Sequence, residues 1–221
     1  MRVKPTAMLA LMTLLITIVL AVPMGLIATY NRGSWVDWSV MALSVLGFSV
    51  PVFVFGCILV YSFAKELRWV PVQGYKCITE GVGPFLHRLV LPAVTLSVIY
   101  IALIARITRA SVLEILGEDY IRTAHAKGLT PCAVLMRHAL RNAAVPIVTV
   151  IGIGVALLIG GVVVTESVFN IPGLVRLTVD AVLGQDYPTI QALILVFSFI
   201  YVVVKLLVDV SYTFLDPRIR Y

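Results

Sequence analysis

Two ionisable residues stand inside the last apolar stretch of the chain, where charge is costly. Lys205 and Asp209 are four residues apart, so a helix would place them on one face. An ionisable side chain within a membrane segment is a functional hypothesis by default. One interpretation is a proton relay, which would make the protein an ion-coupled secondary carrier. The other is an intramembrane charge pair with a structural role, in which the opposite charges neutralise each other.

The remaining reactive residues form no recognisable catalytic or metal-binding pattern. The chain has neither a GxxxxGK[ST] phosphate-binding loop nor a nucleophile elbow. An intramembrane enzyme would need paired catalytic groups at matching depth, and the sequence shows none. We therefore predict no catalytic residue, no metal site and no cofactor in this chain, so that any ATP must be bound by another subunit. The histidines and cysteines lack ligand or disulfide spacing: His87, His125, His138, Cys57, Cys77 and Cys132.

The composition predicts an all-α polytopic membrane protein. Hydrophobic residues make up 61% of the chain and charged residues 13%, with a mean hydropathy of +1.04; a soluble domain is about half apolar and a quarter charged. The net charge of +6 is expected beside membrane spans, so it predicts contact with membrane lipid and not with nucleic acid. Apolar stretches of about 20 residues or more predict five helical spans in one bundle over residues 1–221: 6–30, 38–64, 88–108, 145–165 and 189–214.

Small residues and prolines interrupt these stretches. Gly152, Ala156 and Gly160 recur at four-residue spacing, which predicts a helix face that another helix approaches closely. Neighbouring helices can satisfy the carbonyls that a proline frees. Kinks are therefore expected near Pro23 and Pro51, where they could line a pathway or be ordinary membrane-helix prolines. Prolines occur in four of the stretches: Pro23, Pro51, Pro92 and Pro146.

A single long polar interruption, residues 106–144, separates the third and fourth stretches. Asp119 lies in the first turn of a predicted helix, where a negative charge complements the helix dipole. Gly128 is expected to end that helix. Thr130 and Pro131 then begin a second helix, as its N-cap and first residue. The pattern predicts a helical hairpin outside the bilayer that contacts a soluble partner.

The second helix of this insert is expected to run to about Asn142, with Pro146 beginning the next span. Glu166, at the end of the fourth stretch, is interpreted as an interfacial residue, although contact with substrate or a binding protein stays open. The dense basic cluster within 106–141 favours a cytoplasmic insert, since cytoplasmic loops carry an excess of Lys and Arg.

Several spaced motifs resemble one family of transport proteins. Arg122-Thr123-Ala124, Gly128, and Leu140 twelve residues later match the EAA loop of ABC importer permeases. The segments GEDYIRTAHAKGL, RHALRNA, ESVFNIPGL, QDYP and LDPRIRY resemble the oligopeptide, dipeptide and nickel branch over essentially the whole chain. The general pattern begins with glutamate and ends with proline; here these positions are Arg122 and Arg141, as in the peptide branch. Such permeases normally have six spans, so a first helix and an extracytoplasmic segment are expected to be missing, through truncation or a misplaced start.

The resemblance implies a type I ABC importer transmembrane domain in a bacterial or archaeal inner membrane. It implies a second homologous permease, two cytoplasmic ABC ATPases and an extracytoplasmic substrate-binding protein as partners. The insert 109–144 would carry the coupling helix that sits in a groove of an ATPase. The cargo would be a peptide, a nickel chelate or a similar small solute. The expected coupling residues are Arg122, Thr123, Ala124, Lys127, Gly128, Leu129, Leu140 and Arg141.

Overall fold

The computed structural model describes residues 2–71 and 81–215, and every regular element in these ranges is helical. Cys77 and the segment 216–221, which carries most of the LDPRIRY motif, lie outside the described residues. The elements are α1 (Val3–Tyr30), α2 (Trp35–Ser49), α3 (Val52–Leu59), the π-helix η1 (Val60–Glu66), α4 (Val82–Leu116), α5 (Asp119–Ala126), α6 (Pro131–Ala133), the π-helix η3 (Val134–Ala139), α7 (Leu140–Val168), α8 (Leu174–Leu183) and α9 (Tyr187–Leu215).

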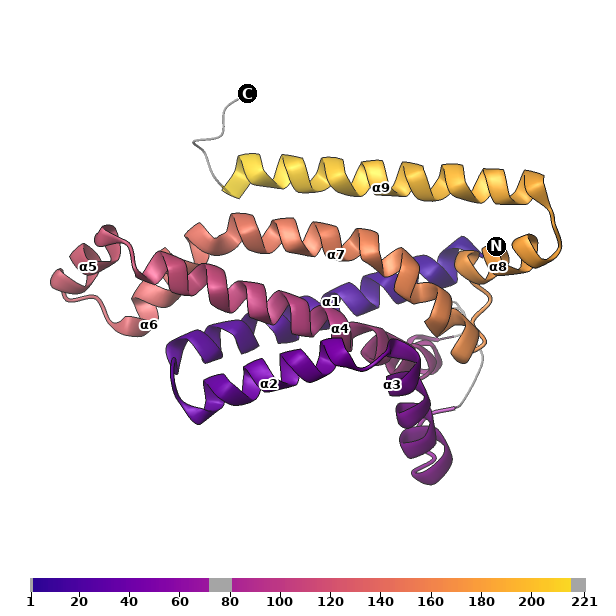
Figure 1. Ribbon diagram of the computed structural model, residues 1–221, viewed down its shortest axis with the longest axis horizontal. Helices are drawn as coiled ribbons and strands as arrows, with labels where there is room; N and C mark the ends of the chain where they lie inside the picture. The colour runs from indigo at the N-terminus through magenta and orange to yellow at the C-terminus, as the bar shows by residue number, and fades with distance from the viewer. Residues whose placement is uncertain (1, 72–80, 216–221) are drawn as a thin grey trace.

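The long helices lie roughly side by side and give the molecule two distinct ends (Figure 1). The insert that contains α5 and α6 projects at one end, on the same side as the α1–α2 turn. The N-terminus and α8 lie at the other end. Helices α1, α4, α7 and α9 are long and apolar enough to cross a membrane, and the bent pair α2 and α3–η1 brings the possible total to five.

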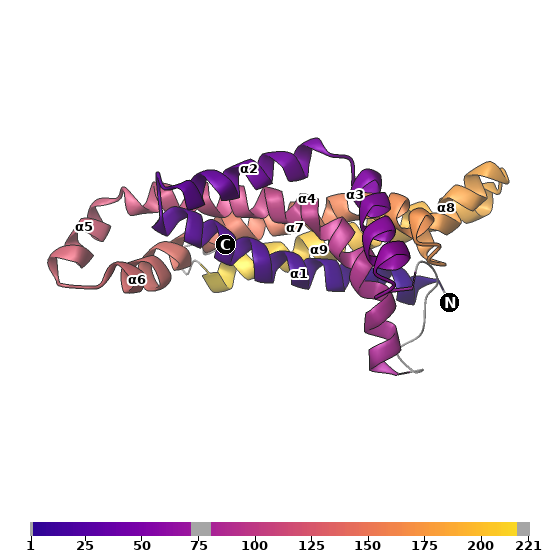
Figure 2. The same ribbon diagram turned by 90° about the horizontal axis from the view of Figure 1, so that it is seen from below.

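The second expected span is not one helix. Residues 38–64 divide at Val50 and Pro51 into α2 and the α3–η1 segment, which meet at an angle of 102°. Pro51 has no N–H to continue the α2 hydrogen-bond ladder, and the residue before a proline is pushed to extended backbone; Val50 accordingly has φ −95° and ψ 126°. The break is far larger than the expected kink, and α3 stands across the long axis of the bundle (Figure 2). Pro23, by contrast, lies inside an unbroken α1.

Two other boundaries differ from the sequence expectation. Helix α4 continues past residue 108 to Leu116, because its last turns still pack against the insert. The second helix of the insert does not stop near Asn142: α6, η3 and α7 follow one another without a break, and Pro146 lies inside α7. A proline within a helix removes one backbone hydrogen bond, a loss that neighbouring helices can offset in a membrane bundle.

The core lies where α1, α4 and α7 meet. Buried Leu9, Leu96 and Leu158 belong to one cluster there, with Ile171 at the end near α8. Helices α1 and α4 approach so closely that a Cβ on Gly25 would lie 2.7 Å from the Cβ of Thr108. Small residues therefore set the spacing of the central helices.

Candidate functional site: the polar insert and its anchors

The insert begins with the short helix α5, which is positioned by its apolar face. Ile121 and Ala124 are buried, with Val134 of η3, against Ile115 and Leu116 at the end of α4. These positions recur every three or four residues on α5, as expected for one face of a helix. The insert therefore packs against the last turn of α4 and is held by this contact as well as by its chain connections.

A glycine turn ends α5 as the sequence predicts. Gly128 has φ +81°, in the left-handed region. Its N–H donates to the carbonyl of His125 at 2.9 Å, and the Leu129 N–H donates to the carbonyl of Ala124 at 3.3 Å. Paired bonds of this kind satisfy the last carbonyls of a helix and favour glycine at the turn. The turn thus has one defined geometry, although it is exposed.

The return path of the insert starts at Thr130, also as predicted. The Thr130 hydroxyl accepts a hydrogen bond from the Ala133 N–H at 3.4 Å, and Pro131 is the first helical residue. The Tyr120 hydroxyl accepts a hydrogen bond from Nδ2 of Asn142 at 2.9 Å, which joins α5 to α7. The insert is consequently held at α4 on one side and at α7 on the other.

The expected coupling residues divide into two groups. Ala124 is buried and Leu140 is half-buried within the cluster formed by Leu26, Val112 and Leu135. These two hold the insert and do not present a surface to a partner. The others are exposed at the tip of the insert or along its return path: Arg122, Thr123, Lys127, Gly128, Leu129 and Arg141.

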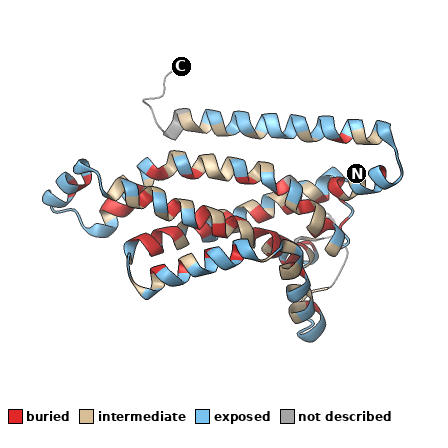
Figure 3. Cartoon of the chain, in the orientation of Figure 1, coloured by how far each residue is buried: buried red, intermediate tan, exposed pale blue. Residues whose placement is uncertain are grey.

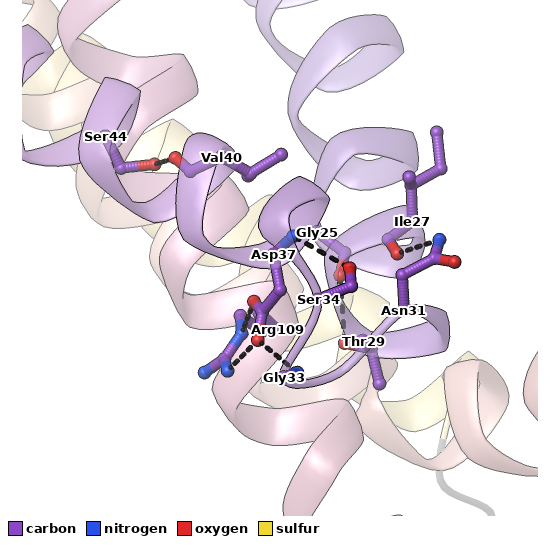
Figure 4. A network of polar contacts seen from close by, with 10 residues as sticks. All are labelled: Gly25, Ile27, Thr29, Asn31, Gly33, Ser34, Asp37, Val40, Ser44 and Arg109. Carbon is purple, nitrogen blue, oxygen red and sulfur yellow. Dashed lines mark hydrogen bonds and ion pairs between the residues drawn. The ribbon is translucent and has the colours of Figure 1, made fainter.

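Sequence reasoning missed a buried ion pair near the insert. Asp37, in the first turn of α2, is only 4% exposed. Arg109 of α4 donates to it through Nε at 2.5 Å and Nη2 at 2.7 Å, and the Gly33 N–H donates to Oδ2 at 3.1 Å (Figure 4). Ser34 caps α2 by accepting from the Asp37 N–H. The α1–α2 turn is therefore fixed to α4 on the side of the insert.

A second buried acid holds the opposite end. Glu166 is 0% exposed, so its interpretation as an interfacial residue was wrong. Its Oε1 accepts from the Thr6 hydroxyl at 2.6 Å, and its Oε2 accepts from the Arg176 N–H at 2.9 Å. The Thr6 hydroxyl in turn accepts from the Leu174 N–H at 2.8 Å. Thr6 and Glu166 together satisfy N–H groups in the first turn of α8, which Gly173 at the N-cap cannot do.

The glycine before α8 makes room for this carboxylate. A Cβ on Gly173 would lie 1.8 Å from Oε1 of Glu166. The ESVFNIPGL motif is thus a clamp that joins the ends of α7 and α1 to the start of α8.

A comparison with protein families decides the class of the chain. The family of binding-protein-dependent transport system inner membrane components matches residues 21–221. The chain belongs to this family. It is the permease component of a binding-protein-dependent ABC importer, located in the inner membrane, and works with ATPase and binding-protein partners.

Relatives of the permease agree with this assignment. A probable peptide ABC transporter permease of Sinorhizobium fredii is 54% identical over 220 residues, which are 100% of this chain and 70% of that protein. A putative peptide transport system permease of Brucella abortus is 44% identical with the same coverage. The glutathione transport system permease GsiC of Escherichia coli is 42% identical over 100% of this chain and 69% of its own length.

Solved structures confirm the fold of the permease. Two inward-facing crystal forms of the MetNI methionine ABC transporter match with TM-scores of 0.75 and 0.77 at 16% and 17% identity. The matches cover 97% and 96% of this chain and 94% of each matched chain. The expected type I ABC importer transmembrane fold is therefore confirmed.

Of the small residues predicted to form a packing face of the permease, only some contact another helix closely. A Cβ on Gly152 would lie 2.5 Å from Cγ2 of Val208, so α7 and α9 approach closely there. Ala156 lines a hollow of about 280 Å³ between the same two helices. A Cβ on Gly160 would meet no described atom within 4 Å, whereas one on Gly161 would lie 2.8 Å from Leu96. Within this chain the close contact to α4 thus passes through Gly161, and a packing role for Gly160 stays a prediction.

Lys205 and Asp209 both line the α7–α9 hollow, together with Tyr212. Among residues 2–71 and 81–215 they do not form an ion pair with each other, so the expected charge pair is absent from the described structure. Both side chains are exposed, as is most of α9 (Figure 3). They share a helix face, as the spacing requires, without neutralising each other by direct contact.

Proposed function

We propose that this permease imports peptides and that the tip of its insert is the surface on which an ATPase acts. The observation that carries the second part is the exposed Gly128 turn between two anchored helices. An exposed element with one fixed geometry can receive a displacement and pass it to the bundle. Buried Ala124 and half-buried Leu140 hold the element, while Arg122, Thr123, Lys127 and Leu129 remain available to a partner.

The proposed assembly follows the family pattern. It contains this permease, a second homologous permease, two cytoplasmic ABC ATPases and one extracytoplasmic substrate-binding protein. The insert faces the cytoplasm, and the end that carries α8 faces the binding protein. The chain itself binds no ATP and catalyses no reaction. A peptide cargo is supported by relatives whose names refer to peptides and to glutathione, itself a small peptide.

Substitutions at Gly128 test the role of the insert. A Cβ there would meet no described atom within 4 Å, so a substitution tests the backbone conformation alone. Valine strongly disfavours φ +81°, whereas asparagine tolerates the left-handed region. Gly128→Val should therefore abolish ATP-dependent peptide uptake by proteoliposomes that contain the complete importer. Gly128→Asn is the matched control and should retain uptake.

Two outcomes would contradict this proposal. If Gly128→Val imports peptide as well as the unaltered importer does, the geometry of the turn is not needed for coupling. If cysteines at Arg122 and Lys127 form no cross-link to an ATPase in intact membranes, the tip is not the docking surface. The ion-coupled carrier is the alternative, supported by the position of Lys205 and Asp209 in one hollow. It predicts uptake that needs an ion gradient and no ATP.

A further inference from the structure

The Asp37–Arg109 ion pair joins two helices whose other contacts are small. The buried residues of α2 besides Asp37 are Val40, Ser44 and Gly47. A Cβ on Gly47 would lie 3.1 Å from the Cβ of Ala102, so α2 lies flat against α4 there. No large side chain of α2 is buried among these contacts. Packing alone would therefore offer little resistance to movement of one helix along the other.

The ion pair supplies the directional contact that the packing lacks. Arg109 binds both carboxylate oxygens of Asp37, and a two-pronged pair of this kind fixes orientation as well as distance. The partners are 72 residues apart in sequence, so the pair stabilises neither helix by itself. Its effect is to make α2 follow α4.

Helix α4 connects this pair directly to the insert. Arg109 and Leu116 lie on the same helix, about 10 Å apart along its axis at 1.5 Å per residue. Leu116 packs against the buried cluster of α5 and η3. A displacement of the insert that moves the end of α4 thus reaches Arg109 through one unbroken helix.

The far end of α2 is the place where such a displacement changes direction. At Val50 and Pro51 the chain turns by 102° into α3, which stands across the long axis of the bundle (Figure 2). Pro51 has no N–H to donate, so one backbone hydrogen bond that would stiffen this elbow is missing. Movement of α2 along α4 would therefore reposition α3 at this elbow.

We propose that Asp37 and Arg109 are positioning residues that transmit movement of the insert through α2 to the Pro51 elbow. The proposal rests on the proposed role of the insert as the surface on which the ATPase acts. It assigns neither residue to substrate. It requires that α2 and α4 move together and that α3 changes position when the ATPases bind nucleotide.

The test measures nucleotide-dependent movement of α3 in the complete importer, without any cargo. The native cysteines are replaced by serine, and thioether-linked spin labels are attached to Ile58→Cys on α3 and Leu195→Cys on α9. Both native side chains are exposed, at 52% and 71%. In the otherwise unaltered importer, ATP with vanadate should shift the distance between the labels. The absence of any shift would overturn the proposal.

Asp37→Asn keeps the shape of the side chain but removes its charge. The distance shift should be lost while ATP hydrolysis persists, a combination that simple unfolding would not give. Asp180→Asn is the matched control, because it breaks an exposed ion pair with Arg2 (3.5 Å), and it should leave the shift unchanged. A full shift in Asp37→Asn would refute the transmission role.

A disulfide replaces the ion pair by a covalent link. The separation of 3.1 Å at Gly47 and Ala102 is near the Cβ–Cβ spacing of disulfides, about 3.5–4.5 Å, so Gly47→Cys and Ala102→Cys should cross-link. The oxidised cysteine pair should restore the distance shift in Asp37→Asn. Reducing the disulfide after purification should abolish the shift again. This comparison holds even if Asp37→Asn assembles only when the disulfide is formed, because reduction follows assembly. A shift that persists after reduction would overturn the proposal, as would a cross-link that blocks the shift in a chain with intact Asp37. Since no peptide is involved, failure of peptide import does not affect this result.

Discussion

The Glu166 clamp predicts that substitutions at Gly173 and Glu166 have non-additive effects on the free energy of opening of α8. Gly173→Ala places a methyl group 1.8 Å from Oε1 and 2.1 Å from Cδ of Glu166, so the carboxylate must leave its site. The displaced group loses its hydrogen bonds to Thr6 and Arg176. Hydrogen bonds to a charged group contribute about 1.5–3 kcal/mol each. Loss of both bonds therefore costs about 3 kcal/mol or more.

The expected effect is local opening of α8, because the clamp satisfies its first N–H groups. At about 1.4 kcal/mol per tenfold change, a loss of 3 kcal/mol raises the opening equilibrium about a hundredfold. Glu166→Gln should cost less, about 1–3 kcal/mol, since the amide keeps the shape and its oxygen can still accept from the Arg176 N–H, but the charge that strengthens these hydrogen bonds is lost. Hydrogen–deuterium exchange of the amides of Leu174–Leu183, measured on the importer in lipid nanodiscs, reports these opening free energies.

The decisive experiment is the double substitution. In a Glu166→Ala background the methyl group of Gly173→Ala has no carboxylate to displace. Gly173 has φ −95° and ψ −178°, which alanine adopts without strain. Gly173→Ala should then be neutral, or stabilising by about 0.4–1 kcal/mol through the unfolded state. If Gly173→Ala accelerates exchange equally in both backgrounds, the glycine is not there to admit Glu166 and the reasoning is refuted.

Two further predictions concern the α7–α9 contact. Gly152→Val should force Val208 away at a cost of about 1–3 kcal/mol, and so lower the denaturant midpoint of the purified chain. Gly160→Val is the matched control and should leave the midpoint unchanged. Equal losses of stability in the two variants would contradict the packing of α7 against α9 at Gly152. Lys205→Met combined with Asp209→Asn should leave ATP-driven uptake by proteoliposomes intact, because neither group is bound by a partner in the described structure. If the double variant loses uptake, and the unaltered chain shows uptake driven by an ion gradient, the ion-coupled secondary carrier is favoured.

Local signals were read correctly from the sequence, because they depend on few neighbours. The Gly128 turn and the Thr130 cap with Pro131 occur where the residue types predict them. Long apolar runs likewise predicted the long helices. The 102° elbow was only partly foreseen: Pro51 predicts a weakened helix, but the size of a bend depends on what the two halves pack against.

Contacts between distant segments could not be predicted in this way. Glu166 stands at the end of an apolar stretch, where a charge ordinarily reaches water, and its partner Thr6 is 160 residues away. The one available signal was Gly173 in the position before a helix that usually carries a capping side chain. Asp37 offered a similar signal three residues after Ser34, but nothing indicated that Arg109 would reach it. For the glycines of α7, spacing alone could not say whether Gly160 or Gly161 meets α4.

The two buried acids solve the same physical problem at opposite ends of the bundle. A carboxylate in an apolar bundle is tolerated only when donors surround it. Asp37 lies in the first turn of α2 and Glu166 lies against the first turn of α8, where unpaired N–H groups and the helix dipole favour negative charge. Each acid also fixes a connecting turn to a distant helix, α4 in one case and α1 in the other. Between these fixed ends the helices meet through glycines, as at Gly25, Gly47 and Gly152. Directional bonds thus hold the ends while the middle is held mainly by packing, so a displacement at the insert can reach the far end only by movement of whole helices.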